Sequence, residues 1–502
     1  MRKDLIWRIP LGILGGLMGL YAFPTENVFW LAPLIPAVIM IATLGTTFLA
    51  ALLIGFLAGQ AFYISHIEWL SLYLGPVPLL ALSTLTSFYF ALGTATTSWL
   101  YGRLKPKGLG LVRFAFAAAG IWTLREWLSN NFPYGGFPWS RLSMTQSDSF
   151  MSHWVYWGGL SLLSFVIAAI GSLLALLIID GKFFKRRGQI AAFSTFSALL
   201  LIPLITPMGF GTSKTGEITV AAVQGNANAG LFSNLSRGTI LNNHIEATDA
   251  VIDSGKTIDL LVWPENASDI DPLRSEDARA KIDAVADSVN APFIFGTITK
   301  RGEDTYNSTL LWEPGVGPTD YYDKKRPVPF AEFVPDRDFW RMLAPDLIDL
   351  VPRGYSFGTR DGIYELDGFN AGSLICFEIA ADDISRGLAL DGANIILSQT
   401  NNADFGYSDE TYQQAAIARL RAIETGRVVV NISTVGLSEI YLPSGDVAQS
   451  LPWYEAGAMI ADVPLYEGTT PAMSFGVWFD LINAIFVSGA LATGLRKRRA
   501  RR

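Results

Sequence analysis

The sequence predicts a multi-domain protein: a polytopic α-helical membrane domain, with an α/β domain inserted before its last helix. Three observations support this. Hydrophobic residues make up 50% of the chain and charged residues only 17%, as in membrane proteins. Long apolar segments follow one another from Ile9 to Pro207. Between Thr215 and Val463 short apolar runs alternate with amphipathic stretches, which is the pattern of an α/β domain.

The apolar segments are long enough to cross a bilayer as helices, since about 20 residues suffice. We expect eight transmembrane helices, seven before the α/β domain and one after it. The first segment is a retained anchor rather than a signal peptide, because further hydrophobic segments follow it without a small-residue cleavage site. Its glycines are expected to pack helices together. The eight spans lie near residues 9–23, 28–44, 46–65, 75–101, 111–128, 154–179, 189–206 and 474–494.

Basic residues predict the orientation, because Lys and Arg collect in cytoplasmic loops. They form four clusters: one before the first span, one between spans four and five, one between spans six and seven, and one in the tail 496–502. With eight spans all four clusters fall on the cytoplasmic side. The sequence therefore divides into an N-terminal transmembrane domain (1–207), an extracytoplasmic domain (208–472), and a C-terminal helix with a basic cytoplasmic tail (473–502).

The region 208–472 is strongly acidic, with 38 acidic and 19 basic residues and a net charge of −19. This is the reverse of the charge of a nucleic-acid-binding surface, so no nucleic-acid partner is expected. An exposed unpaired cysteine outside the cytoplasm is a liability unless it is used. The only cysteine of the chain, Cys376, lies in this region. One thiol can form neither an intramolecular disulfide nor a structural zinc site, so Cys376 is either a buried bystander or a nucleophile.

Hydrophobic periodicity predicts the elements of the α/β domain in chain order. Residues 234–254, 275–290 and 411–425 have the spacing of amphipathic helices, and the first and last of these are followed by glycine. The strands are expected at 217–224, 258–263, 293–298, 309–312, 371–376, 393–398 and 428–432. This count suits one α/β domain of about 260 residues with helices covering a mixed or paired sheet.

Three polar residues follow strands or polar turns, where the chemistry of such folds is usually carried out. Glu265 follows Leu260-Leu-Val-Trp-Pro, Lys324 follows Tyr321-Tyr-Asp, and Cys376 ends the run Ala371-Gly-Ser-Leu-Ile. Each has a simpler explanation. Trp-Pro-Glu is also a common turn with a solvated carboxylate, and Lys-Lys-Arg is also a common charged surface.

In combination these segments resemble the nitrilase superfamily, whose members use a glutamate, a lysine and a cysteine in this chain order. The surrounding segments Val223-Gln-Gly-Asn226, Val328-Pro-Phe-Ala-Glu332, Asn402-Ala-Asp-Phe-Gly406 and Arg419-Leu-Arg-Ala-Ile-Glu424 are similar too. A nitrilase-like domain between seven leading spans and one trailing span resembles the apolipoprotein N-acyltransferase family in particular. The loop Gly136-Phe-Pro-Trp139 is also typical of that family.

The resemblance implies an α-β-β-α sandwich and a catalytic triad of Glu265, Lys324 and Cys376. Glu265 would be the general base and Lys324 would stabilise the thiolate and an oxyanion, with the backbone N–H of Phe377 as a second donor. Glu332 would be an auxiliary carboxylate, and Glu378 is a further auxiliary or substrate-binding candidate. No metal or other cofactor is implied. Phe377, Asp404 and Ala331 depart from residues usual in the family, which affects the expected substrate pocket but not the triad.

The implied reaction is ping-pong. Cys376 takes an acyl chain from the sn-1 ester of a phospholipid as a thioester. The α-amine of an S-diacylglyceryl cysteine at a lipoprotein N-terminus then receives it as an amide. The implied location is the bacterial inner membrane, with the catalytic domain on the periplasmic side and the protein a monomer. Two alternatives remain. One is a membrane-tethered amidase that hydrolyses a small amide with the same triad. The other is a transporter with an accessory domain, which the small number of ionisable residues in the spans disfavours.

Overall fold

The computed structural model describes residues 5–179, 186–230, 233–234, 236–351 and 354–499. These residues form two compact units. One lies within residues 1–71, 75–208 and 471–502, and the other within 72–74 and 209–470. Part of the predicted orientation rests on basic residues outside the described ones, namely Arg2, Lys3, Lys182, Lys185, Arg501 and Arg502.

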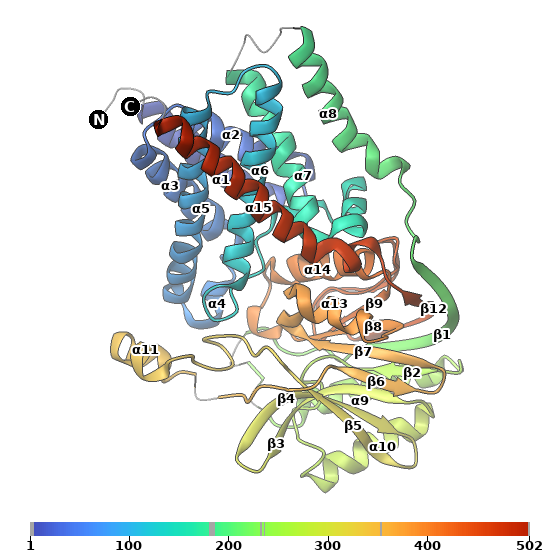
Figure 1. Cartoon of the computed structure of the whole chain (residues 1–502). Coiled ribbons are helices and arrows are strands. Elements are labelled where there is room, and N and C mark those ends of the chain that lie inside the picture. The colour runs from blue at the N-terminus through green and yellow to red at the C-terminus, as the bar shows by residue number, and fades with distance from the viewer. Residues whose placement is uncertain (1–4, 180–185, 231–232, 235, 352–353, 500–502) are drawn as a thin grey trace. The chain divides into compact units, whose positions relative to one another are not determined.

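The first unit is helical, and its helices pack side by side (Figure 1). Five of them are long and apolar enough to cross a membrane: α1 (Leu5–Ala22), α3 (Phe48–His66), α5 (Pro76–Leu104), α7 (His153–Ile179) and α15 (Pro471–Arg499). Helix α6 (Leu109–Asn131) is also long, but it carries Arg113, Arg125 and Glu126. Helix α8 (Arg186–Ile205) has a shorter apolar stretch, Ile190–Ile205, and α2 (Leu34–Thr43) and α4 (Leu70–Leu74) are shorter helices. The membrane character of this unit is thus clear, whereas the predicted number of eight spans is not confirmed.

Glycines on one face of α1 allow close helix packing, as the sequence predicted. A Cβ atom at Gly16 would lie only 2.1 Å from the carbonyl oxygen of Ala58 in α3, and one at Gly12 would lie 2.5 Å from the side chain of Ile54. Small residues at such contacts let two backbones approach, which is how membrane helices gain van der Waals contact. The glycines therefore serve helix packing.

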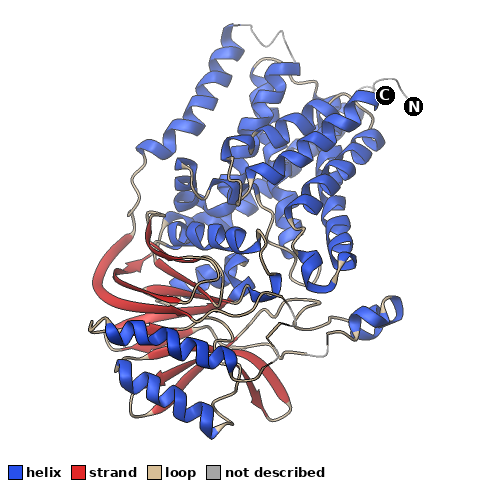
Figure 2. Ribbon diagram, turned by 180° about the vertical axis from the view of Figure 1, so that it is seen from behind, coloured by secondary structure: helices blue, strands red, loops and turns tan. Residues whose placement is uncertain are grey.

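The second unit contains two six-stranded sheets (Figure 2). In the first sheet the order is β12-β1-β2-β3-β4-β5, and β1, β2 and β3 are parallel neighbours. In the second sheet the order is β11-β10-β9-β8-β7-β6, and β7, β8 and β9 are parallel. The strands of the first sheet are β1 (Thr212–Gln224), β2 (Leu260–Val262), β3 (Phe293–Arg301), β4 (Asp304–Glu313), β5 (Gly317–Asp323) and β12 (Gly457–Gly468). Those of the second are β6 (Ile363–Leu366), β7 (Phe369–Ile375), β8 (Ile395–Thr400), β9 (Val428–Ser433), β10 (Ser438–Tyr441) and β11 (Val447–Leu451).

Successive side chains of the central strands point to opposite faces of the sheet, which explains how the layers of the unit pack together. In β1, Val220 and Ala222 belong to a core shared with the second sheet, whereas Ala221 and Val223 belong to a core under the helices α9 and α10. Because successive strand residues point to opposite faces, a strand that is apolar throughout can bury both. The first sheet is therefore covered on both sides.

Helices complete an α-β-β-α arrangement. Helices α9 (Thr239–Asp253) and α10 (Glu276–Val289) cover the first sheet, and α13 (Asp382–Leu390) and α14 (Glu410–Thr425) cover the second (Figure 1). Local chemistry sets the ends of α10. The hydroxyl of Ser275 accepts a hydrogen bond from the Ala278 N–H at the start, and Asn290 adopts a left-handed conformation at the end. The small helices α11 (Arg337–Leu343) and α12 (Pro345–Ile348) lie in the connection between the sheets.

The predicted strands and helices of this unit are confirmed apart from their boundaries, and one boundary matters. Cys376 was expected to end a strand, but β7 ends at Ile375 and Cys376 begins the 3₁₀ turn Cys376–Ala380. The φ angle of Cys376 is +54°, a left-handed conformation that breaks strand geometry. Strands β5, β6 and β10–β12 and helix α13 were not predicted, because they are short, at sheet edges, or more polar.

Candidate active site

Glu265 is the first of the predicted site residues along the chain. It lies in the turn after β2, two positions beyond Trp263. The turn Pro264–Glu265 lies directly against β3, where the Gly296 N–H donates to the Pro264 carbonyl at 3.0 Å. A Cβ at position 296 would lie 2.6 Å from the Cα of Glu265. Only glycine therefore allows this approach, which buries Glu265 to 4% exposure.

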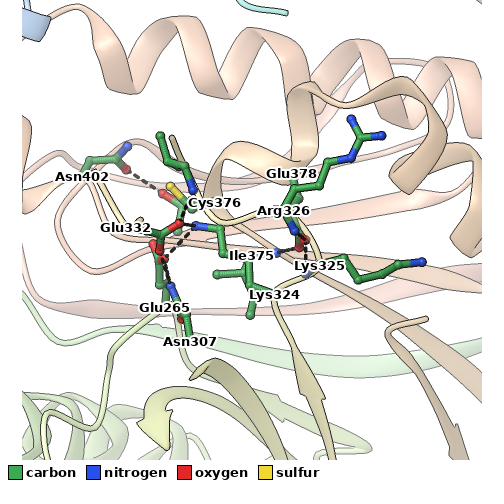
Figure 3. A network of polar contacts seen from close by, with 12 residues as sticks. Glu265, Asn307, Lys324, Lys325, Arg326, Glu332, Ile375, Cys376, Glu378 and Asn402 are labelled. Atoms are coloured by element: carbon green, nitrogen blue, oxygen red, sulfur yellow. Dashed lines mark hydrogen bonds and ion pairs between the residues drawn. The ribbon is translucent and has the colours of Figure 1, made fainter. Parts of the chain in front are cut away.

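Lys324 directly follows β5, and its N–H donates to the carbonyl of Asn307 in β4 at 2.8 Å. Its side chain is 1% exposed, whereas those of Lys325 and Arg326 extend away to Asp361 and Asp383 (Figure 3). Only the first of the three basic residues points inward, so the interpretation of this motif as a charged surface is wrong for Lys324. It is correct for the other two residues.

Cys376 lies at the start of the turn after β7, in the left-handed conformation noted above. Such a backbone is costly for a residue with a side chain and persists where the surroundings hold it in place. Here Glu378 holds it: its carboxylate accepts from the Ile375 N–H at 2.9 Å and from the N–H groups of Lys325 and Arg326 at 2.8 and 3.0 Å. Tyr322 donates to the same carboxylate at 3.0 Å. Glu378 thus connects the loop of Lys324 to the turn of Cys376.

The three predicted residues lie together, although they come from two different sheets (Figure 3). The Nζ atom of Lys324 lies 2.9 Å from Glu332 Oε2 and 3.6 Å from Glu265 Oε1. Glu265 also contacts Cys376 by a side-chain hydrogen bond. Glu332, predicted as an auxiliary carboxylate, is held in addition by the Val328 N–H at 2.6 Å. Phe377 is the next residue in the turn of Cys376 and is partly exposed.

Charge sharing sets the protonation of this cluster. Burial raises the pKa of Glu265, and the positive charge of Lys324 only partly offsets the effect. Burial acts to lower the pKa of Lys324, but the carboxylates of Glu332 and Glu265 raise it overall, so the lysine stays charged. Burial and the neighbouring Glu265 raise the pKa of Cys376 well above its usual value, against the effect of Lys324. The resting sulfur is therefore a thiol, and its proton has to leave as the sulfur attacks.

Two amide side chains of the site were missed in the sequence. The Nδ2 atom of Asn307 donates to both Glu265 and Glu332, at 2.7 and 2.9 Å. The Nε2 atom of Gln414 lies 3.8 Å from the sulfur of Cys376. A buried asparagine in the middle of β4 was the available signal for the first. Gln414 offered none, because polar residues are ordinary on an amphipathic helix.

The geometry suits covalent acyl transfer through sulfur: a thiol, a carboxylate that can take its proton, and a fixed cation beside both. Within the described part of the chain, no group of three or more His, Cys, Asp or Glu side chains is arranged to hold a metal ion.

Comparison with known proteins gives matches along most of the chain. Residues 15–173 match the family model described as apolipoprotein N-acyltransferase N-terminal domain, and residues 219–470 match that of carbon-nitrogen hydrolase. A protein of Mycolicibacterium smegmatis named apolipoprotein N-acyltransferase is 30% identical over 469 residues, covering 87% of this chain and 76% of the relative. A protein of the same name from Vibrio parahaemolyticus is 28% identical, covering 91% of both chains. Among solved structures, a nitrilase-superfamily amidase from Nesterenkonia AN1 is 16% identical, with a TM-score of 0.40, over 51% of this chain and 93% of that one.

Proposed function

Because the chain belongs to the apolipoprotein N-acyltransferase family, we propose that it acylates lipoproteins in two half-reactions at Cys376. It is an acyltransferase of the nitrilase superfamily that uses a lipid donor and a lipoprotein acceptor. The observation that carries the proposed mechanism is the approach of the buried side chains of Glu265 and Lys324 to the partly exposed Cys376.

In the first half-reaction, Cys376 Sγ attacks the sn-1 ester carbonyl of a phospholipid. Glu265 takes the thiol proton as the S–C bond forms and returns it to the glycerol oxygen as the C–O bond breaks. Lysophospholipid leaves, and an acyl thioester remains on the sulfur. Lys324 and the backbone N–H of Phe377 stabilise the oxyanion, and Glu332 with Asn307 holds the lysine in place.

In the second half-reaction, the α-amine of an S-diacylglyceryl cysteine attacks the thioester. The N–C bond forms, the C–S bond breaks, and Glu265 carries a proton from the nitrogen to the sulfur. Neither step calls for a metal or an organic cofactor. The enzyme returns to its starting state, which is the basis of ping-pong kinetics.

A membrane location fits both substrates. Extracting a lipid into water costs about 0.8 kcal/mol per methylene, so a membrane-tethered thiol avoids a large barrier. We propose a bacterial inner-membrane protein, active as a monomer, with eight spans and both termini in the cytoplasm. Residues 1–207 and 473–502 form its membrane and cytoplasmic parts, and the acidic domain 208–472 faces the periplasm.

Mass spectrometry separates acyl transfer from hydrolysis. The purified protein is incubated with phospholipid alone, then with a synthetic diacylglyceryl-cysteine peptide. We expect an acyl adduct on Cys376 that accumulates with phospholipid and is discharged rapidly by the peptide, because an acyltransferase has to exclude water from its thioester. Release of free fatty acid at the same rate with and without peptide would identify a tethered hydrolase instead.

Labelling tests the orientation. In a Cys376→Ala background, a cysteine introduced for Ser254 is expected to react with a membrane-impermeant reagent in cells whose outer envelope is permeable. Labelling that requires lysis of the inner membrane would contradict the periplasmic placement.

A further inference from the structure

Near the thiol lies a buried carboxyl group that the mechanism above does not use. Glu410 is the first residue of α14, and only 2% of its surface is exposed. Its Oε2 atom accepts one hydrogen bond, from Asn402 Nδ2 at 2.6 Å. No other described residue donates to it, and none of the described cations forms an ion pair with it. By contrast, Glu265 and Glu332 share Lys324, and Glu378 accepts from four groups.

A chain of hydrogen bonds connects Glu410 to the sulfur. The Nδ2 atom of Asn402 also donates to Gln414 Oε1 at 2.8 Å, and Thr400 donates to the same oxygen at 2.8 Å. With its oxygen accepting twice, the amide of Gln414 directs its Nε2 atom at the sulfur of Cys376. Glu410 and Gln414 are four residues apart and so share one face of α14. The carboxyl group therefore belongs to the surroundings of the thiol.

The charge of Glu410 acts on the hydroxyl of Tyr454, which belongs to a group of aromatic rings. Tyr407, Tyr412, Trp453 and Tyr454 form a cluster in which the rings of Tyr407 and Tyr454 are stacked, 4.1 Å apart. The hydroxyl of Tyr454 and the indole Nε1 of Trp453 are buried, and no described residue forms a hydrogen bond with either atom. Burial raises the pKa of Tyr454 to about 12, and the carboxylates of Asp404 and Glu410 add to the effect. The cluster thus borders an acidic region.

These features match one kind of ligand. A carboxylate without an ion-pair partner costs several kcal/mol to bury, so burial keeps Glu410 as the neutral acid at neutral pH. A cation bound beside it offsets that cost and favours the carboxylate. Aromatic faces attract ammonium groups, and an ammonium has three N–H donors for the carboxylate and the tyrosine hydroxyl. We propose that Glu410 and Tyr454 form the subsite that receives the α-ammonium group of the acceptor peptide. This inference rests on the proposed function and adds the residues that recognise its second substrate.

The subsite also completes the proton balance of the second half-reaction. An α-ammonium carries two protons that have to leave before the product is an amide. Glu265 passes one to the sulfur. Glu410, which the bound ammonium keeps ionised, takes the other as the N–C bond forms and the C–S bond breaks. Burial raises the pKa of Glu410 to about 8, close to the ordinary value of about 8 for an α-ammonium. A proton therefore passes between the two at little cost in free energy, and Glu410 later releases it to solvent.

Glu410→Gln tests the subsite, because glutamine keeps the shape and can still accept from Asn402. Thioester formation from phospholipid is expected to stay within about threefold of the parent protein. The KM for the diacylglyceryl-cysteine peptide in the discharge step is expected to rise at least tenfold. Discharge by hydroxylamine, which is uncharged at neutral pH, should change by less than about twofold. Tyr454→Phe should raise the peptide KM by a smaller factor, about threefold.

Asp409→Asn is the matched control. It removes the same charge from the adjacent position, where the side chain is exposed, and is expected to leave both steps unchanged. An unchanged peptide KM in Glu410→Gln would overturn the subsite, and so would equal slowing of thioester formation and discharge, which indicates a structural role. If the peptide does not discharge the thioester of the parent protein at all, the proposed acyl transfer itself is wrong. This outcome is distinguished from failure of the subsite because it is seen in the parent protein and not only in the variant.

Discussion

Two clusters of buried charges in the α/β unit differ in the ratio of cations to carboxylates. In the site cluster (Glu265, Lys324 and Glu332), one ammonium group is shared by two carboxylates beside a thiol. In the second cluster (Arg386, Arg421 and Glu424), two guanidinium groups contact one buried carboxylate, and Arg421 also pairs with the partly exposed Asp382 at 2.7 Å. The side chains of both clusters are almost completely buried except that of Glu332, which is 14% exposed.

The difference appears in the protonation of the carboxyl groups. Burial acts to raise the pKa of Glu424, but Arg386 and Arg421 outweigh it, and the pKa of this group is lowered. The pKa of Glu265 is raised, because Lys324 does not compensate for burial and for Glu332. The guanidinium of Arg421 also donates to the carbonyls of Ile379 and Ala380 at 2.9 and 2.8 Å. A buried charge that is fully bonded holds the fold together, whereas one that is incompletely compensated can exchange a proton.

Removing the sulfur is the sharpest test of the site cluster. Cys376→Ala should eliminate the acyl adduct and the product amide, because no other side chain in the chain can form a thioester. Intact-mass analysis after incubation with phospholipid checks the adduct, and the melting temperature in detergent checks folding. Product formation by this variant at the parental rate would contradict the assignment.

Changes to the charged partners of the thiol should have the next largest effect. Glu265→Gln removes the proton acceptor and Lys324→Met the positive charge, so each should slow thioester formation by about 10²-fold or more. Single-turnover measurement of adduct formation tests both. Lys325→Met is the matched control, since that side chain extends to Asp361, and its rate should equal that of the parent.

The second cluster should respond in stability rather than in chemistry. Glu424→Gln leaves two buried guanidinium groups short of a partner, and breaking such a pair costs about 3–5 kcal/mol. We expect a clear fall in melting temperature, with the thioester rate of the folded protein within about tenfold of the parent. Lys214→Gln, which breaks an exposed pair with Glu217, should cost less than about 1 kcal/mol. Equal stability of the two variants would show that the second cluster contributes no more to folding than an exposed ion pair does.

The raised pKa of Glu410 makes the stability of the folded protein depend on pH. This pKa is about 8 in the folded protein and about 4.5 in an unfolded chain, so between these values the folded state binds the extra proton. Stability from this group is therefore fully present below pH 4.5 and is lost as the pH rises to 8. Glu410→Gln should remove this loss. The variant should gain stability over the parent from pH 5 to pH 8, by up to a few kcal/mol. A difference that does not change with pH would contradict the raised pKa.

Much of the fold was evident from local sequence. Long apolar segments indicate the membrane helices by composition alone, and runs such as Leu260–Trp263 and Val428–Ile432 predict buried strands by their length and branched side chains. Strands β10 and β11 were missed because both are short, and because β11, at the edge of the sheet, is mostly exposed. The number of membrane spans stays open for a related reason: Arg113, Arg125 and Glu126 in α6 weaken the apolar signal.

The residue types at the candidate site are evident from the sequence alone, because Glu265, Lys324 and Cys376 are those that covalent acyl transfer needs, in a recognisable chain order. The neighbours that control them depend on the packing of distant segments. Gln414 on α14 reaches the thiol, Asn307 in β4 contacts Glu265, and Glu410 on α14 contacts Asn402. These contacts arise because two sheets pack face to face and α14 covers the second. Protonation is also set by this packing, since it depends on burial and on how many cations each carboxylate shares, and neither is a local property of the chain.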